Sequence, residues 1–450
     1  LNFQGNMYLA SEAEMWLILL IPPPLVNDMI ETVKPESVGL CSQRLGRISS
    51  WLQQQIDGEK LAGASVLVGR QGKAAWFETA GYREREISTA FEKDTIVRIY
   101  SMSKPVTSVA AMMLYESGCF QLDHPVSQYL PEFADTPVWI GGDAPVSETI
   151  PQESPILVRH VLSHTSGLTY GFMNTNVVDE MYRDKGLDQS SPETDLAEWT
   201  ETLAGIPLIC QPGSQWNYSV STDVVGRLVE VWSGMSLDQF FHDNIFKPLG
   251  MTDSGFVVPE SKRERFAALY APLVGGALGQ VNPPPVSERG GLKLQDAVQG
   301  SAYFKSPGVF SGGGGLVSTM SDYHRFCRML QNGGELDGCR LLAPTTVKHM
   351  RTNHLPDKKD MAAMGQPGWS ETSYDGIGFG LGFAVVLDPV TASIITSPGE
   401  YHWGGAASTF FWIDPVQDLH VIFMTQLMPS STYPIRRELR TLVYQAITGA

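Results

Sequence analysis

The strand-like runs of this chain gather at its two ends, and the helical patterns lie between them. Residues 62–82 (AGASVLVGRQGKAAWFETAGY) predict a hairpin, because a β-branched run is followed by the turn GRQG and then by a second apolar run. Three runs near the C-terminus, separated by Pro, Asp and Gly, are also typical of strands: 378–389 (GFGLGFAVVLDP), 408–415 (STFFWIDP) and 419–426 (LHVIFMTQ). The chain therefore predicts a sheet that is built from both of its ends.

Apolar residues at helical spacing predict an amphipathic helix over 43–57, and another helix closes the chain near 434–447. The middle of the chain carries further helical patterns, at 102–117, 155–163, 221–234, 236–247, 321–332 and 344–351. Long loops rich in Pro and Gly, such as 257–315, join them. We expect an α/β domain from 36–104 and 335–450, a mainly helical domain from 105–334, and a functional site in the cleft between them.

The N-terminal segment stands apart from this organisation. Residues 1–6 contain NFQG, which looks like the remnant of a cleavable tag, and residues 7–35 form an extension. The apolar run 15–21 is too short to span a bilayer, and acidic residues precede it, which argues against a signal peptide. We expect this run to pack on the body as a helix or strand, and we expect a cytoplasmic protein.

The net charge and the cysteines argue against several classes of partner and site. A formal net charge of −16 argues against nucleic acid and against an anionic membrane surface as partners. The five cysteines are odd in number and widely spaced, which disfavours a disulfide framework or a zinc site and favours free thiols. The chain has no H-E-x-x-H, no P-loop and no G-x-G-x-x-G after a strand, so we expect no metal and no cofactor.

Ser101 and Lys104 form an S-x-x-K at the start of the helix predicted over 102–117. Residues three apart share a helix face, so Lys104 can reach Ser101 and help to remove its proton. Pro105 is tolerated in a first helical turn, and Gly118 is a suitable residue to end the helix. The alternative is purely structural, because serine is a common N-cap and S-x-x-K also occurs by chance.

Two later segments can complete a site around Ser101. Tyr218, after a Pro-Gly turn and before an apolar helix, can act with Lys104 as a proton relay, or can simply pack at the helix start. In 402–415 (HWGGAASTFFWIDP), two glycines open a strand, and the Ala406 N–H can pair with the Ser101 N–H as an oxyanion hole. The alternative there is a glycine bulge. We interpret His160 and His164 as structural and expect neither of them beside Ser101.

Four segments together resemble one known superfamily: YSMSKPVTSVAAMMLYESG (100–118), LVRHVLSHTSGL (157–168), IFKPLGMTDSGF (245–256) and GGGGLVSTMSDYHRF (312–326). Over residues 36–447 the chain resembles the serine β-lactamases and penicillin-binding proteins, and most closely the class C-like family VIII carboxylesterases. The resemblance implies an α+β fold with a mostly antiparallel sheet flanked by helices and an all-helical domain beside it. It also implies Ser101 as nucleophile, Lys104 as its partner and Tyr218 as the tyrosine of a Y-x-N motif.

Two departures from that superfamily concern the substrate. Val220 stands where lactamases have an asparagine, and Trp403-Gly404-Gly405 stands in place of K-T-G, which removes a cation that would meet the β-lactam carboxylate. The resemblance therefore implies a small-molecule ester as substrate, an acyl-enzyme on Ser101, and Trp403, Gly404, Gly405 and Val220 as substrate-binding residues. A weak β-lactamase activity stays open. The alternatives are a β-lactamase or D-Ala-D-Ala peptidase, an acyltransferase of the same fold, and a non-catalytic binding scaffold.

Overall fold

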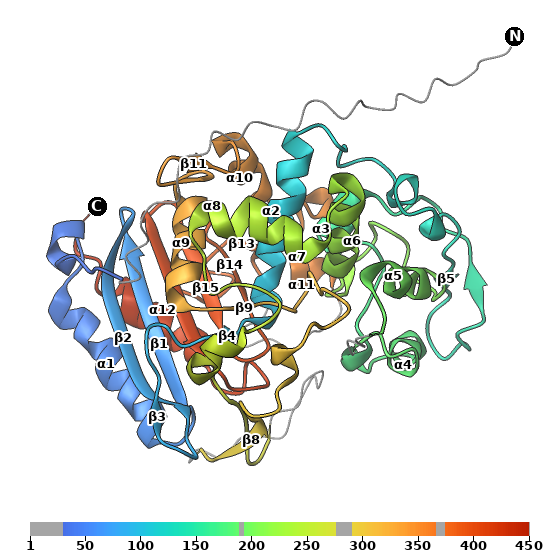
Figure 1. Cartoon of the computed structure of the whole chain (residues 1–450). Coiled ribbons are helices and arrows are strands. Elements are labelled where there is room, and N and C mark those ends of the chain that lie inside the picture. The colour runs from blue at the N-terminus through green and yellow to red at the C-terminus, as the bar shows by residue number, and fades with distance from the viewer. Residues whose placement is uncertain (1–29, 189–192, 276–289, 366–373, 450) are drawn as a thin grey trace, which may run out of the picture.

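The computed structural model describes residues 30–188, 193–275, 290–365 and 374–449, so the tag remnant and the apolar run 15–21 lie outside the described residues. An antiparallel sheet of eight strands dominates the fold, in the order β12-β13-β14-β15-β16-β1-β2-β3. Its strands are β1 (Gly63–Arg70), β2 (Lys73–Glu84), β3 (Thr89–Ala90), β12 (Ile377–Phe379), β13 (Ala384–Val386), β14 (Tyr401–Gly404), β15 (Phe410–Asp414) and β16 (Leu419–Thr425). The pairing of β16 with β1 joins the two chain ends, which confirms the predicted architecture (Figure 1).

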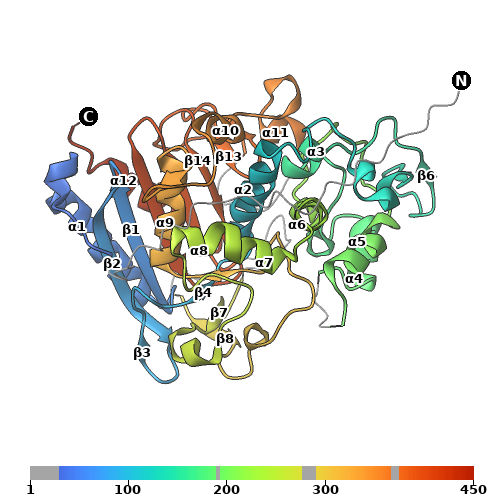
Figure 2. The same ribbon diagram turned by 45° about the horizontal axis from the view of Figure 1, so that its top comes forward.

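Side chains that alternate along each central strand enter two different cores. Val66 and Val68 of β1 belong to a core that includes residues of α1 (Ser42–Asp57) and α12 (Ile435–Tyr444). Leu67, between those two valines, belongs to the larger core on the other face. Because successive side chains of a strand point to opposite faces, a strand that is apolar at every position requires helices on both sides. Figure 2 shows α1 and α12 on one side of the sheet, and α9 and α2 on the other.

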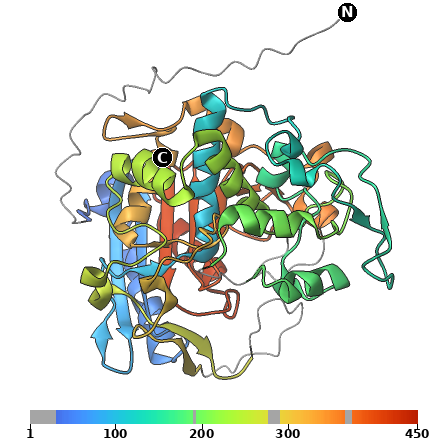
Figure 3. The same ribbon diagram turned by 45° about the vertical axis from the view of Figure 1, so that its right-hand side comes forward.

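The helices of the larger core come from the middle of the chain. Helix α2 (Ser103–Glu116) is buried along almost its whole length, and it crosses in front of the red C-terminal strands in Figure 3. The other helices are α3 (Val158–Leu162), α4 (Val177–Asp184), α5 (Leu196–Ala204), α6 (Ser221–Ser233), α7 (Leu237–Phe241), α8 (Lys247–Leu249), α9 (Met320–Gln331), α10 (Pro344–Met350) and α11 (Met361–Met364). The expected end of α2 is confirmed, because Gly118 has a φ of 79° just beyond the helix.

The middle of the chain is less purely helical than predicted. Residues 257–315, predicted as a loop, contain the paired strands β7 (Leu269–Pro272) and β8 (Leu292–Asp296). The helix predicted over 236–247 is divided by a π-helical turn at His242–Phe246. The remaining short strand pairs are β4 (Val97–Arg98) with β9 (Val317–Ser318), β5 (Val138–Trp139) with β6 (Thr149–Ile150), and β10 (Glu335–Leu336) with β11 (Cys339–Arg340).

Two apolar runs near the C-terminus are hairpins and not single strands. The run 402–415 contains the end of β14, a turn, and β15, so the prediction of one strand opened by two glycines is wrong. The run 378–389 divides into β12 and β13 at a turn in which Gly382 has a φ of 98°. A Cβ on Gly382 would lie 2.2 Å from the Ser108 hydroxyl of α2, so this turn is pressed against the helix that follows Ser101.

The five cysteines are free thiols in the structure. Within the described ranges, no group of three or more His, Cys, Asp or Glu residues is placed to hold a metal ion. None of the helices in those ranges has both the length and the apolar character needed to cross a bilayer.

Candidate active site

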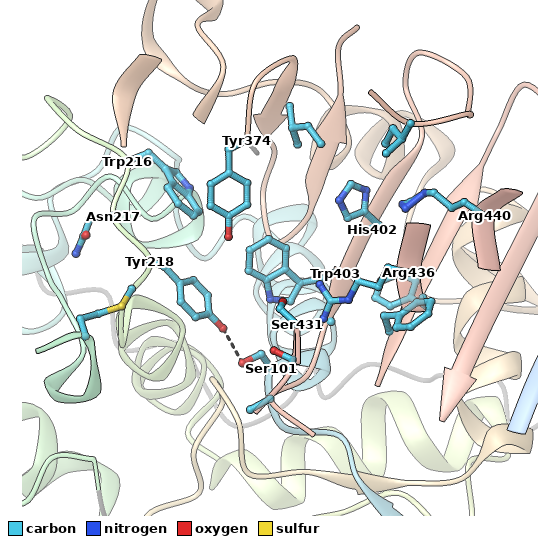
Figure 4. Close-up of a pocket in the computed structure, with 18 of the residues that line it drawn as sticks. Ser101, Trp216, Asn217, Tyr218, Tyr374, His402, Trp403, Ser431, Arg436 and Arg440 are labelled. Carbon is cyan, nitrogen blue, oxygen red and sulfur yellow. Dashed lines mark hydrogen bonds between the residues drawn. The ribbon is translucent and has the colours of Figure 1, made fainter. Parts of the chain in front are cut away.

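Ser101, Lys104 and Tyr218, which are far apart in the sequence, meet at one point of the structure. The Tyr218 hydroxyl donates to Ser101 Oγ at 2.6 Å (Figure 4). Lys104 Nζ lies 3.4 Å from the same oxygen. Lys104 Nζ also lies 4.7 Å from the centre of the Tyr218 ring. Because the contact with Tyr218 is much the shorter one, the phenol oxygen is the better placed group to exchange a proton with Ser101.

A tight turn places Ser101 ahead of α2. Strand β4 leads into a 3₁₀ turn over Tyr100–Met102, and α2 begins at Ser103. Tyr100, immediately before Ser101, has a φ of 41°, which is a strained conformation for a residue with a bulky side chain. Such strain is commonly found at functional sites, where the surrounding structure holds the backbone in place.

Tyr218 lies on a short segment that hydrogen bonds hold just before the tyrosine. The Asn217 N–H donates to the His164 carbonyl at 2.8 Å, and its side chain donates to the Leu168 carbonyl at 2.7 Å. The Trp216 N–H donates to the Met364 carbonyl at 2.9 Å. These anchors on other loops hold the phenol over Ser101, since the segment itself has no regular structure until α6 begins.

Lys104 is almost completely buried and donates to two further oxygens. Its Nζ lies 2.6 Å from the Gly313 carbonyl and 2.9 Å from the Tyr170 hydroxyl. Asp223 holds the Gly313 segment, because its carboxylate accepts from the Gly313 N–H at 3.0 Å and from the Ser311 hydroxyl at 2.5 Å. With three oxygens around it, Lys104 is placed to donate hydrogen bonds as an ammonium group.

The structure adds Tyr170 to the site, although no motif of the sequence predicts it. Burial, followed by the neighbouring Tyr218 and Asp223, raises the pKa of Tyr170 well above its usual range. Tyr170 therefore stays a neutral phenol that accepts from Lys104, and its ring centre lies 5.3 Å from that of Tyr218. It connects the lysine to the tyrosine that contacts Ser101.

His164 lies closer to the site than expected. Its ring centre is 5.1 Å from that of Tyr218, so the prediction that neither histidine lies nearby is wrong for this residue. Its Nδ1 lies 3.2 Å from the Ser219 hydroxyl and not near Ser101. Burial and the charge of Lys104 lower the pKa of His164 well below its ordinary value, so it stays neutral. The interpretation of His164 as a structural residue is compatible with these contacts.

The hairpin between β14 and β15 brings the Ala406 amide to the Ser101 pocket. The Gly405 N–H donates to the Thr409 carbonyl at 2.7 Å and closes the turn, and Ala406 follows it on the pocket wall. Neither the Ser101 nor the Ala406 amide has a hydrogen bond to another described residue. Both residues line the pocket, so their amides are candidates for the two donors that a developing oxyanion requires.

We predict that Gly405→Ala greatly reduces any activity of this site. A Cβ at Gly405 would lie 2.2 Å from the Ile99 carbonyl oxygen and 2.4 Å from the Thr409 hydroxyl, so the turn has to move away from Ser101. A displacement of about 1 Å in a reacting group can cost roughly 100-fold in rate. Gly46→Ala in α1 is the control, because nothing lies within 4 Å of its new Cβ, and we expect a stability gain of about 0.5–1 kcal/mol there. Equal activities of the two variants would contradict this role of the turn.

The pocket has an aromatic wall and a polar wall. Ser101, Tyr218, Trp403, Gly404 and Ala406 line it. Trp216 and Tyr374 lie on one side, and His402, Arg436 and Arg440 lie on the other (Figure 4). Ile377, Ile394, Ser430 and Ser431 also line the pocket.

Two predicted substrate-binding residues are not among the described residues that line this pocket. Val220 is only 2% exposed and packs in the larger core, because it caps α6 with its side chain turned inward. Gly405 lies behind the wall, packed against Ile99 and Thr409. Substrate contact by Val220 and Gly405 therefore stays a prediction that the pocket lining does not support, and the packing of Gly405 gives it a role in the turn.

Comparisons with known proteins agree on one family. The family model described as Beta-lactamase matches residues 48–445. Protein Rv1367c of Mycobacterium tuberculosis is 34% identical over 84% of this chain and 89% of its own, and Esterase EstB of Burkholderia gladioli is 31% identical over 88% and 94%. The solved structure of EstCE1, described as a hydrolase with promiscuous acyltransferase activity, is 27% identical, covers 91% of this chain and 99% of its own, and has a TM-score of 0.71.

Proposed function

Because this chain belongs to the beta-lactamase family, we propose that it is a serine carboxylesterase that hydrolyses short-chain carboxylic esters through an acyl-enzyme on Ser101. The observation that carries the proposal is the 2.6 Å contact between Ser101 Oγ and the Tyr218 hydroxyl, with Lys104 beside both. Its similarity to Esterase EstB supports ester hydrolysis as the reaction.

In the first half of the proposed reaction, Tyr218 first gives up its hydroxyl proton to solvent and becomes a phenolate. Ser101 Oγ then forms a bond to the ester carbonyl carbon and loses its proton to the Tyr218 oxygen. The Lys104 ammonium, 4.7 Å from the Tyr218 ring centre, offsets that negative charge. The carbonyl oxygen becomes negative and accepts hydrogen bonds from the Ser101 and Ala406 amides. The bond to the alcohol then breaks, and Tyr218 returns the proton to the leaving oxygen.

In the second half, water replaces the alcohol. Tyr218 takes a proton from the water molecule while the water oxygen attacks the acyl carbon. As the carboxylic acid leaves, Tyr218 returns the proton to Ser101. Tyr170 stays neutral throughout, and its contacts hold Lys104 and Tyr218 in place relative to each other. Metal or cofactor chemistry has no part in this scheme.

Transfer of the acyl group to a second alcohol, or opening of a β-lactam, is the second candidate. EstCE1 is described with promiscuous acyltransferase activity, and both reactions use the same acyl-enzyme chemistry. We place them after ester hydrolysis, because Trp403 replaces the lysine of the lactamase motif and the valine at 220 brings no amide to the pocket.

We predict that 4-nitrophenyl butyrate is turned over with a kcat/KM at least about 100-fold above that of a chromogenic cephalosporin. Steady-state kinetics of the purified full chain on both substrates measure the ratio, with and without a chelator, which should have no effect. A higher kcat/KM for the cephalosporin would contradict the esterase proposal. Adding a primary alcohol during butyrate hydrolysis shows how much acyl group goes to the alcohol.

A further inference from the structure

The glycine loop of residues 312–315 lies between α2 and α6, and each helix contacts it with a charged side chain. A Cβ on Gly312 would lie 3.0 Å from the nearest side chain of α2 and 3.0 Å from a carbonyl oxygen of α6, so the loop fills the space between the two helices. Lys104 Nζ of α2 donates to the Gly313 carbonyl at 2.6 Å, and the Gly313 N–H donates to Asp223 Oδ1 of α6 at 3.0 Å. One glycine thus joins a buried cation to a buried carboxyl group.

The surroundings of Asp223 hold its carboxyl group as an anion. Asp223 is 5% exposed, and its Oδ1 accepts from the Ser311 hydroxyl at 2.5 Å as well as from the Gly313 N–H. A hydroxyl donor at that distance is typical of an ionised acceptor. Burial raises the pKa of Asp223, but the charge of Lys104 and these two donors act against that rise. Lys104 is therefore one of the groups that keep the carboxylate ionised.

The other titratable groups near this pair are either neutral or paired with a charge of their own. Arg227 of α6 forms an ion pair of 3.0 Å with the glutamate three residues along the same helix. Burial raises the pKa of Asp188, and the charge of Arg183 acts against that rise, so Asp188 has a cation beside it. Tyr170 and His164, which border the lysine, are neutral. The buried ammonium group of the site thus has the carboxylate of α6 as its matching anion.

We propose that Asp223 is a positioning residue of the reaction, because its carboxylate supplies the fixed negative charge that keeps Lys104 an ammonium group beside Tyr218. The inference rests on the proposed esterase function, in which that ammonium group offsets the Tyr218 phenolate. Both hydrogen bonds from the glycine loop and Ser311 end at Oδ1 of Asp223. Asparagine at 223 can accept the same two bonds and lacks the charge, so it separates the effect of the charge from support of the loop.

Asp223→Asn is expected to move the whole pH profile of kcat/KM for 4-nitrophenyl butyrate to lower pH, by about one unit. Without the nearby negative charge, Tyr218 and Lys104 both lose their protons more easily. The rising side of the profile, where Tyr218 becomes a phenolate, and the falling side, where Lys104 loses its charge, therefore move together. KM at the optimum should change little. Titration of the released acid at constant pH measures the rates of the wild type and the variant across the profile.

Asp322→Asn on α9 is the matched control. Asp322 is also a buried residue in the first turn of its helix, and its Oδ2 accepts from the Asp253 N–H at 2.7 Å and from the Ser254 hydroxyl at 2.8 Å. We expect the control to keep the wild-type profile. If Asp223→Asn lowered the rate at every pH and left the profile unmoved, the proposal would be overturned, and Asp223 would only support the loop.

A second measurement does not depend on activity, so it still decides the charge pairing if the wild type hydrolyses no ester. Lys104→Met and Asp223→Asn each leave one buried charge without its partner, whereas the double variant removes both charges. Melting curves of the three variants are compared with that of the wild type. A double variant that melts above Asp223→Asn, or that folds where Asp223→Asn does not, supports the pairing. A double variant that melts at or below Asp223→Asn, or that stays unfolded with it, overturns the proposal.

Discussion

Replacing Ser101 with alanine is expected to lower ester hydrolysis by on the order of 10⁴-fold or more, because removal of a nucleophile eliminates the covalent route. The fold should persist. The substitution removes one oxygen atom at the start of a buried helix and leaves its backbone contacts unchanged. Initial rates with 4-nitrophenyl butyrate measure the first effect, and a melting curve measures the second.

Ser117→Ala is the matched control for this variant. Ser117 follows the other end of α2, and among the described residues its hydroxyl donates to the Met113 carbonyl alone, at 2.9 Å. We expect this control to keep the wild-type rate. Activity of Ser101→Ala within tenfold of the wild type would exclude Ser101 as the nucleophile.

Lys104→Met and Tyr218→Phe are each expected to lower kcat by about 100-fold or more, with KM much less affected. Methionine is chosen because Lys104 is 1% exposed, and a smaller residue would leave a cavity. The double variant should be at most a few-fold worse than the poorer single variant. Tyr218 takes the proton and Lys104 offsets the charge of its phenolate, so the two act as one unit and either loss already interrupts the transfer.

Measurements of kcat and KM for both single variants and the double variant test whether Lys104 and Tyr218 act together. Tyr115→Phe on α2 controls for loss of a phenol outside the site. If the two losses multiplied in the double variant, Lys104 and Tyr218 would act independently. If Tyr218→Phe kept near-normal kcat, another base would have to take the Ser101 proton, and His164, 5.1 Å from Tyr218 between ring centres, would be the first to test.

The central strands could be predicted because their signal is local. Residues 63–70 are buried at every position, so the apolar run itself reports a strand that is covered on both faces. The hairpin between β14 and β15 could not be predicted in the same way. Its turn at Gly405–Thr409 lies inside an apolar stretch. Position 405 needs a glycine because a side chain there would collide with the Ile99 carbonyl, which is some 300 residues away in the sequence.

The candidate site also has one part that the local sequence predicts and another part that depends on distant contacts. Ser101 and Lys104 are three residues apart at a predicted helix start, so their spacing predicts that they meet. Tyr170 has no motif of its own, and it contacts Lys104 only because the loop after α3 folds over α2. The loss of a lysine at 403 suggested a pocket without that cation, yet Arg436 reaches the neighbouring Gly404 from α12. The catalytic roles of Ser101, Lys104 and Tyr218, and the domain boundaries, stay predictions.

The most direct measurement is the mass of the protein during turnover. Wild-type chain mixed with excess 4-nitrophenyl butyrate and quenched in acid should gain the mass of one butyryl group, and peptide mapping should place that group on the segment that contains Ser101. The Ser101→Ala variant should gain none. Hydrolysis by the wild type without any acyl adduct, or an adduct on another residue that persists in Ser101→Ala, would contradict an acyl-enzyme on Ser101.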